Sequence, residues 1–377
     1  MKHFSFKHFR AYLTASNKPD AWLLGIIICL VAAGLLIFLS ASLGLIARDG
    51  ASFGNIATTR LIATILGAGI AYLASVIHYK HLRHYTLAIL LASILLTALV
   101  FVPGIGQKHG GASRWISLFG FWLQPSEILK IAFVIYGAAF FATVKDKVRT
   151  FSYGLLPLFA LLGIAGFLLL LQPDTDTFFV LFMALFAMFL TAGGRLRHIG
   201  VMMLAGALAL GLLVATKPYL MNRVTTFFDP AADPQGAGYQ VQQSLIAIGS
   251  GGLTGKGFGQ SVQKFEYLPE AIGDSIFAVA GEEFGFLGAT ILILLFLALL
   301  LRGLRIASRA PDLFSGLLSV GIVILIGVSA FLNIASMLAI IPLSGLTLAF
   351  VSHGGTSLVI TLLEVGLLLN ISRYQRT

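Results

Sequence analysis

The stretch WLLGIIICLVAAGLLIFLSASL, residues 22–43, decides the fold class of this chain. It contains no Asp, Glu, Lys or Arg. A bilayer core about 30 Å thick is crossed by about 20 apolar residues in a helix, because each residue rises about 1.5 Å. The stretch is longer than the apolar part of a cleaved signal peptide, which has about 7–15 residues. It therefore predicts a transmembrane helix.

Nine further runs of this kind follow, and the fifth and sixth are separated only by a turn at 172–176. The sequence predicts an all-α, polytopic integral membrane protein with about ten transmembrane helices. One membrane domain spans 22–373, between a basic segment at 1–21 and a short tail at 374–377. The predicted spans are 22–43, 61–77, 86–102, 127–143, 152–171, 177–192, 199–216, 276–300, 313–335 and 353–371.

The composition excludes a soluble globule. Of the 377 residues, 58% are hydrophobic and 11% are charged, whereas a soluble domain carries about 25% charged residues. The formal net charge of +10 does not indicate nucleic-acid binding, because the basic residues lie in short clusters between apolar runs rather than on one soluble face. The single cysteine, Cys29, lies inside the first run and forms no intrachain disulfide.

The distribution of Lys and Arg orients the chain. With a cytoplasmic N-terminus, sixteen of the 25 basic residues fall on the inner side and nine on the outer side or in helix ends. Only three of the 15 acidic residues, Asp20, Asp146 and Asp312, fall on the inner side. Both termini are therefore predicted to be cytoplasmic. The inner loops are short and basic, which suits contact with anionic membrane lipids.

Two outer segments are long and chemically mixed, residues 103–126 and 217–275, and a third, 341–355, is rich in Gly, Pro and Ser. Segment 217–275 lies between the seventh and eighth predicted helices. Ordered loops of this length usually carry function. We therefore expect the chemistry of the protein to lie on these segments.

The first outer segment and the helix after it contain Arg114, Glu127 and Lys130. Arg114 stands beside Trp115, and such aromatic residues also occur as a plain belt at the membrane interface. Glu127 and Lys130 are three apart on one helical face and can pair. Ionisable groups at membrane depth are costly and indicate function, although the pair can also be purely structural.

The turn Gln172-Pro173-Asp174-Thr175-Asp176 places two carboxylates at one membrane edge. Asp174 or Thr175 can cap the following helix through its side-chain oxygen. Capping requires only one of these residues, so the second carboxylate leaves a polar or cation site open as an alternative.

Segment 217–275 contains Arg223 near its beginning and Asp274 near its end. Its part from 244 to 248 is apolar enough for a short interfacial helix. Its glycines, together with Lys256 and Lys264, could bind a phosphate through backbone and ammonium groups, but the spacing is not that of a P-loop. A plain flexible loop is the alternative.

Five carboxylates lie within 18 residues at the end of this segment. If 270–285 is helical, Glu270 and Asp274 share a face. A carboxylate held near a cation can act as a general base on a sugar hydroxyl, and capping of the next helix is the structural alternative for Asp274. The five residues are Glu266, Glu270, Asp274, Glu282 and Glu283.

The last outer segment contains Ser352 and His353. Neighbouring side chains on a helix do not face each other, so the two do not form a nucleophile and base pair. We interpret both as polar lining residues of a site.

Taken together, these segments resemble the FtsW/RodA family of shape, elongation, division and sporulation proteins, over nearly the whole chain. SVQKFEYLPEA and the two Asp-Pro pairs are more similar to the division branch, FtsW, than to the elongation branch, RodA. The motifs that carry the resemblance are GASRWISLFGFWLQPSEILKI, QPDTDT, RVTTFFDPAADPQGAGYQVQQSLIAIGSGGLTGKGFGQSVQKFEYLPEA, IFAVAGEEFGFLGA and IPLSGLTLAFVSHGGTSL.

The resemblance implies ten transmembrane helices and a peptidoglycan glycosyltransferase that polymerises lipid II without a nucleotide sugar. It implies that Asp274 is the catalytic aspartate and that Glu127 and Lys130 are the family's glutamate and lysine. Around Asp274 the family usually has His-Thr-Asp-Phe, where this chain has Ile272, Gly273 and Ser275. The last segment has His353 and Thr356 where the family usually has Tyr and Ser, and Asp176 replaces a usual glycine.

The expected site combines Asp274 as general base with residues that bind the substrate. A divalent cation, Mg or Mn, held by carboxylates is one candidate for stabilising the leaving diphosphate. The predicted substrate-binding residues are Lys130, Glu127, Arg114, Asp174, Arg223, Lys264, Glu270, Ser352 and His353.

The resemblance also implies location and partners. We expect the bacterial cytoplasmic membrane, enrichment at the division septum, a class B penicillin-binding protein as transpeptidase partner and other membrane proteins of the division machinery. A lipid II flippase, a RodA-type elongation polymerase and a catalytically weak scaffold are the alternatives. Few intramembrane charges and no repeated halves disfavour a transporter.

Overall fold

The computed structural model describes residues 18–49, 53–109, 112–118, 121–230, 233 and 236–375. Most of the predicted basic segment 1–21, Pro234 of the second Asp-Pro pair and the end of the tail lie outside these ranges, so the predictions for them stay predictions. The predicted domain limits also stay predictions.

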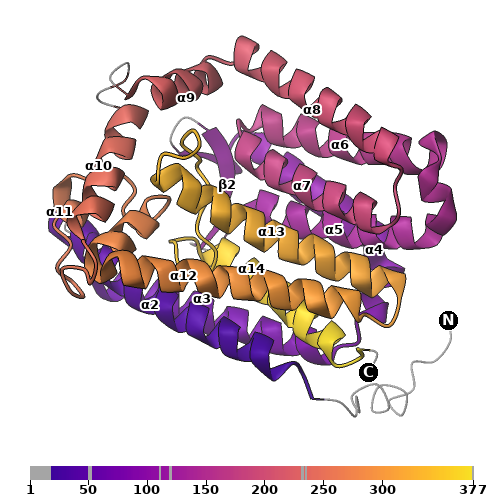
Figure 1. Ribbon diagram of the computed structural model, residues 1–377, viewed down its shortest axis with the longest axis horizontal. Coiled ribbons are helices and arrows are strands. Elements are labelled where there is room, and N and C mark those ends of the chain that lie inside the picture. Colours follow the sequence, from indigo (N-terminus) through magenta and orange to yellow (C-terminus); the bar gives the residue numbers. More distant parts are fainter. Residues whose placement is uncertain are drawn as a thin grey trace.

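Helices make up nearly all of the structure that is described, which confirms the predicted fold class (Figure 1). Within these residues, nine helices are long and apolar enough to cross a membrane, and α7 is a shorter apolar helix of 17 residues. The total of ten spans stays a prediction. The helices are α2 Ala21–Asp49, α3 Phe53–Val76, α4 Lys80–Ala98, α5 Pro125–Val144, α6 Leu156–Leu171, α7 Thr175–Thr191, α8 Leu196–Thr216, α9 Pro218–Phe228, α10 Ala237–Ser250, α11 Gln263–Glu266, α12 Ile276–Ser308, α13 Leu313–Met337 and α14 Gly355–Ser372.

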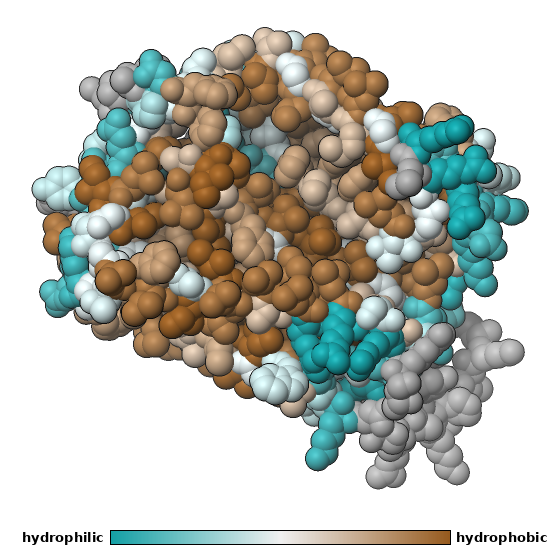
Figure 2. Space-filling view, in the orientation of Figure 1, coloured by the Kyte–Doolittle hydropathy of each residue, from teal (hydrophilic) through white to brown (hydrophobic). Residues whose placement is uncertain are grey.

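The long helices lie side by side, and the polar segments gather at the two ends of the bundle (Figure 1). We call the end with α9, α10 and α11 the loop face, and the end with Asp20 and Arg373 the terminal face. In Figure 2 an apolar surface covers the helices between the two ends, whereas hydrophilic residues gather near the ends. Such an apolar belt is what a lipid-exposed surface requires.

The centre of the bundle is formed by α5, α13 and α14, whose apolar residues are mostly buried against other helices. By contrast, α8 is almost entirely exposed, so its apolar side chains face lipid rather than protein. The site described below lies between the three central helices, at their ends on the loop face.

The first outer segment contains a three-stranded antiparallel sheet, which the sequence did not predict. Its strands are β1 Gly106–His109, β2 Ala112–Leu118 and β3 Phe121–Leu123, in the order β1-β2-β3. Ile116 lies opposite Gly106 on one side and Leu123 on the other. The sheet fixes Arg114 and Trp115 of its central strand next to the start of α5.

The large outer segment 217–275 is ordered by α9, α10 and α11 and by its docking onto α12. The short helix predicted at 244–248 is part of the longer α10. α12 is interrupted at Gly285, which has φ 65° and ψ −166°. Four backbone hydrogen bonds join the interruption to 252–257: Phe286 N to Gly252 O, 2.8 Å; Leu287 N to Leu253 O, 3.1 Å; Lys256 N to Glu282 O, 3.0 Å; and Gly257 N to Glu283 O, 3.0 Å. The loop thus satisfies backbone groups that the broken helix leaves unpaired.

Replacing Gly285 with Ala is expected to destabilise the protein by about 1–3 kcal/mol. The left-handed backbone is strained for an L residue, and an added Cβ would lie 2.3 Å from the backbone N of Gly255. The measurement is the thermal midpoint in detergent. Gly249→Ala in α10 is the control, since a Cβ there meets nothing within 4 Å. Equal midpoints for the two variants would contradict the importance of the interruption.

Candidate active site

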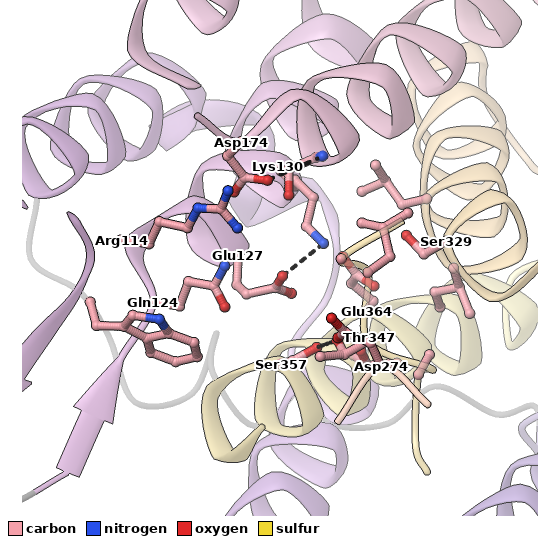
Figure 3. A pocket seen from close by; sticks show the side chains of 18 of the residues that line it. Arg114, Gln124, Glu127, Lys130, Asp174, Asp274, Ser329, Thr347, Ser357 and Glu364 are labelled. Atoms are coloured by element: carbon pink, nitrogen blue, oxygen red, sulfur yellow. Dashed lines mark hydrogen bonds and ion pairs between the residues drawn. The ribbon is translucent and has the colours of Figure 1, made fainter. Parts of the chain in front are cut away.

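A cavity of about 350 Å³ opens among α5, α13, α14, the sheet and segment 345–349 (Figure 3). It collects seven of the ten predicted site residues from widely separated parts of the chain. The charged residues that line it are Arg114, Glu127, Lys130, Asp174, Arg223, Glu270, Asp274 and Glu364. No other side chain described here that lines this cavity carries a formal charge.

Glu127 and Lys130 form an ion pair in the first two turns of α5, with 2.9 Å between Nζ and Oε1. The two side chains are about one-tenth exposed. The pairing expected from their spacing is therefore present, and it lies in the cavity wall. Because the ammonium keeps an anionic partner, the pair can remain charged while enclosed by protein.

Arg114 of β2 reaches the turn before α7. Its Nε donates to the carbonyl oxygen of Gln172 at 3.0 Å, and its Nη2 donates to that of Pro173. Asp174 caps α7 by accepting from the backbone N–H of Thr177 at 3.4 Å, as one of the sequence alternatives expected. Its Oδ2 is buried and, among the residues described, has no hydrogen-bond partner. Capping leaves one carboxylate oxygen of Asp174 available to a ligand.

The ion pair between Asp176 and Arg223 brings the middle of α9 to the cavity. Arg223 Nη1 lies 2.9 Å from Oδ2 of Asp176, and the same oxygen accepts from the backbone N–H of Gly345 at 2.8 Å. A Cβ added at Gly345 would lie 3.6 Å from Nη2 of Arg223 and 3.7 Å from Oδ2 of Asp274. Arg223 and Asp274 therefore converge on one small space.

Asp274 lies in a turn that the last outer segment holds in place. Asn333 Nδ2 of α13 donates to the carbonyl oxygen of Asp274 at 2.8 Å and to that of Leu346 at 2.7 Å. Ser352 Oγ donates to the carbonyl oxygen of Gly273 at 2.8 Å. The backbone N–H of His353 donates to the carbonyl oxygen of Ile272 at 2.6 Å. These bonds fix the backbone on both sides of the Asp274 carboxylate.

The conformation of Asp274 differs from the sequence expectation in two respects. Residues 270–275 form turns and α12 begins at Ile276, so Glu270 and Asp274 do not share a helical face. Glu270 has a positive φ of 49°, and its carbonyl oxygen accepts from the N–H groups of Gly273 and Ser275. The N-cap of α12 is Ser275, so capping does not account for Asp274. The turn nevertheless brings both carboxylates to the cavity.

Burial raises the pKa of Asp274 from 3.8 to about 7. The carboxylates of Glu270 and Asp176 act in the same direction, since a like charge disfavours ionisation. Arg223 and Arg114 oppose this effect. A carboxyl group with a pKa near the operating pH is suited to general base catalysis.

The pH dependence of kcat/KM is expected to show an acidic limb centred near pH 7, the pKa of Asp274. Below that pH the carboxyl is protonated and cannot accept a proton, so kcat/KM falls about tenfold per pH unit. Glu270→Gln removes a neighbouring negative charge, lowers the pKa of Asp274 and moves the limb to lower pH. Initial rates measured between pH 5 and 9 check this, and an unmoved limb would exclude the coupling.

Three predicted substrate-binding residues do not line the cavity. Lys264 is completely buried, with its Nζ 2.7 Å from Oε1 of Glu283 and 2.8 Å from Oγ of Ser40. Lys256 is likewise paired with Glu282 at 2.7 Å. The two lysines thus join the loop to α2 and α12, and the structure does not support the predicted phosphate contact. The sequence could not show this pairing, because the partners are distant along the chain.

Ser352 and His353 lie behind the cavity wall. Besides its bond to Gly273, Ser352 Oγ accepts from the N–H of Leu348 at 2.8 Å. The His353 ring stacks on Phe38, with 5.7 Å between the ring centroids. Both residues therefore support the Asp274 turn, whereas a lining position was expected.

Two supporting residues were missed by the sequence analysis. Arg60 of α3 is buried and donates to the backbone carbonyl oxygens of Ser352, at 2.7 Å, and of Phe350. Asn333 holds Asp274 as described above. The sequence indicates both Arg60 and Asn333 as candidates, since a strongly polar residue in or beside an apolar run is costly in a membrane.

The side chains described here that could ligate a metal do not form a preorganised metal site. In the part of the chain that the structure describes, no three His, Cys, Asp or Glu side chains gather closely enough to hold a metal ion. The divalent cation expected from the sequence stays a prediction, and no catalytic step below depends on it.

Comparison with known proteins identifies the family to which this chain belongs. The FtsW/RodA/SpoVE family model, described as cell cycle proteins, matches residues 21–377. The chain belongs to the FtsW/RodA/SpoVE family. A Bacillus subtilis family member, stage V sporulation protein E, is 37% identical over 363 residues, covering 96% of this chain and 99% of the relative. A probable peptidoglycan glycosyltransferase FtsW from Geobacter sulfurreducens is 42% identical over 311 residues, covering 82% and 83%.

Solved structures of FtsW/RodA/SpoVE-type proteins share the fold. A chain of a peptidoglycan synthase complex that coordinates polymerisation and crosslinking matches with a TM-score of 0.78 and 28% identity, covering 95% of this chain and 99% of that chain. The rod shape determining protein RodA of Thermus thermophilus matches with a TM-score of 0.68 and 27% identity, covering 95% and 98%. The protein is thus a multi-pass membrane protein of this family.

Proposed function

We propose that the protein is a peptidoglycan glycosyltransferase that polymerises lipid II into glycan strands. The observation that carries the proposal is Asp274, a fixed carboxylate with a raised pKa in a cavity that also holds Arg114, Arg223 and Lys130. A carboxylate among cations suits a reaction that takes a proton from a hydroxyl and releases a diphosphate. The names of the relatives support the same activity.

In the proposed step, Asp274 accepts the proton of the 4-hydroxyl of the acceptor sugar. The hydroxyl oxygen attacks the anomeric carbon of the donor sugar, and the bond from that carbon to the diphosphate breaks. A single displacement inverts the anomeric carbon, so an α-linked diphosphate gives a β-1,4 bond. The proton remains on Asp274 and the polyprenyl diphosphate leaves with the electron pair.

The leaving diphosphate gains negative charge, which fixed cations stabilise in a site shielded from water. Arg114 of the sheet and Arg223 of α9 both line the cavity. Lys130 contributes from α5 while paired with Glu127. General base catalysis supplies about 10²–10⁴-fold, so substrate positioning and these charges account for the remainder.

The proposed setting is the bacterial cytoplasmic membrane, with the loop face outside and both termini in the cytoplasm. The apolar belt between two polar ends supports a membrane-spanning bundle (Figure 2). The count of Lys and Arg supports the orientation. A role in division, with enrichment at the septum, rests on the FtsW names among the relatives. Depletion of the protein should then give filamentous cells, whereas depletion of a protein with an elongation role would give spherical cells.

We propose a class B penicillin-binding protein as the transpeptidase partner, together with other membrane proteins of the division machinery. The support is the similarity to a chain from a synthase complex that couples polymerisation to crosslinking. Co-purification with the transpeptidase encoded in the same genome is the direct test.

The test of the activity is the conversion of fluorescent lipid II to a ladder of glycan strands by the purified protein, with and without the partner. Ladder formation supports the proposal. If the protein instead moves labelled lipid II across vesicles and forms no polymer, the flippase alternative is correct. If it does neither with the partner present, it is a scaffold.

A further inference from the structure

Glu364 is a buried carboxylate that the proposed reaction leaves without a role. It is the tenth residue of α14, is 4% exposed and lines the cavity (Figure 3). Unlike Glu127 and Asp176, it has no hydrogen bond or ion pair with any residue described in the structure. Lys130 is the cation that acts on it electrostatically. An unpartnered carboxylate inside an apolar helix is costly, which makes a ligand contact the natural explanation.

Glu364 marks the inner end of the cavity. It lies nine positions after the first residue of α14, so it is about 14 Å along the helix from the loop face. Asp274 lies near that face, since its turn is bonded to Ser352 and His353 just before α14. The cavity therefore extends about that distance from the reacting centre into the bundle.

The wall around Glu364 is only partly polar. Leu325 and Ile326 of α13 supply apolar surface at this depth, while Ser329 and Thr361 supply hydroxyl groups. Lys130 enters from α5 on the opposite side. An enclosed site with apolar walls and a few converging polar groups is typical of ligand binding.

We propose that the inner end of the cavity is a subsite in which Glu364 accepts hydrogen bonds from a donor group of the lipid-linked substrate, a sugar hydroxyl or a peptide amide. A buried carboxyl group has oxygen atoms that accept hydrogen bonds, so a bound group that supplies O–H or N–H can pair with Glu364. This inference rests on the proposed function, because it names the part of the same substrate that the inner end recognises. Glu364 would contribute to binding rather than to the chemical step.

The competing explanation is that Glu364 is only a counter-charge for Lys130, and two substitutions separate the explanations. Glu364→Leu removes both the charge and the acceptor, whereas Glu364→Gln removes the charge and keeps an acceptor. Without the acceptor, a donor group of the bound substrate stays buried and unpaired, so Glu364→Leu should raise the Kd for lipid II by about 10-fold or more. Glu364→Gln should raise it by only about threefold.

Binding is measured with purified protein and labelled lipid II in an Asp274→Asn background, in which no turnover interferes. Asn370→Leu is the matched control, because Asn370 is buried on α14 near the terminal face and its side chain bonds to backbone groups of 75–79. It should lower the thermal midpoint and leave Kd unchanged. Glu364→Leu should instead raise the midpoint by about 2 °C, since it removes an unpartnered carboxylate.

A second ligand, the lipid-linked disaccharide diphosphate without the stem peptide, identifies the donor. If the effect of Glu364→Leu vanishes with this ligand, the peptide supplies the donor; if it persists, the sugars do. The inference is overturned if Glu364→Leu leaves Kd within twofold, or if both variants weaken binding equally and lower the midpoint. If the wild type binds lipid II through Glu364 but forms no polymer, the proposed function fails while the subsite stands. If the wild type does not bind lipid II, both fail.

Discussion

Replacing Asp274 with Asn is expected to lower the rate of lipid II polymerisation by about 10²–10⁴-fold, the usual contribution of a general base. The amide has nearly the same shape as the carboxylate. The bonds from Asn333 to the backbone carbonyl oxygen of residue 274 and from Ser352 to that of Gly273 are kept. It cannot accept the proton of the acceptor hydroxyl. The loss should therefore appear in kcat, with the binding of lipid II little changed. The rate at which purified protein forms glycan ladders gives kcat, and a direct binding measurement gives the Kd for lipid II.

The control for this prediction is Glu270→Gln. Glu270 lines the same cavity and removing it also deletes one negative charge, but in our mechanism it transfers no proton. This variant should keep most of the activity at pH 8, where Asp274 is already ionised in the wild type. Polymer formation by Asp274→Asn at the wild-type rate would remove Asp274 from the mechanism.

Replacing Lys264 with Met is expected to destabilise the protein by about 3–5 kcal/mol, because it leaves the charge of Glu283 buried without its partner. Glu283 would keep the Oγ of Ser40 and the N–H of Ser261, which do not neutralise it. The measurement is thermal unfolding in detergent. The folded fraction should bind lipid II with unchanged Kd, since Lys264 lies outside the cavity.

Two comparisons sharpen this prediction. Adding Glu283→Leu to Lys264→Met removes the unpaired charge and should restore much of the stability. Lys256→Met should cost less, because its side chain is 35% exposed and Glu282 keeps bonds from Ser261, Val262 and Gln263. A large loss of lipid II affinity with intact stability would instead restore the substrate role predicted for Lys264.

The helices could be predicted because the bilayer imposes a length on every apolar run. The first predicted span, 22–43, lies within α2, and the last, 353–371, differs from α14 by one or two residues at its ends. The sheet at 106–123 could not be predicted, since its strands are short and its tryptophans also fit an interfacial belt. The interruption of α12 at Gly285 could not be predicted either, because a glycine inside a predicted helix does not by itself show that the helix is broken there.

Residues of the site could be predicted where a charged side chain stands in or beside a predicted membrane helix. Glu127, Lys130, Asp174 and Asp274 stand out because charged groups beside apolar runs are costly. What cannot be derived from the sequence is which charges meet. Lys264 pairs with Glu283 and lies outside the cavity. Glu364 lines the cavity and forms no ion pair with the residues described. Both outcomes depend on long-range packing of α2, α12 and α14.

The contacts around Asp274 also determine when the site can form during biosynthesis. The Asp274 turn is held by Asn333 of α13 and by Ser352 and His353, which precede the final helix, and Arg60 of α3 holds that last segment in turn. A ribosome delivers these parts in order, so the early helices insert before the residues that hold the Asp274 turn, Asn333, Ser352 and His353, have been made. The nascent protein remains without a formed site until its last helix enters the membrane. A chain truncated before α14 is therefore inactive, and premature release from the ribosome yields no partly active enzyme.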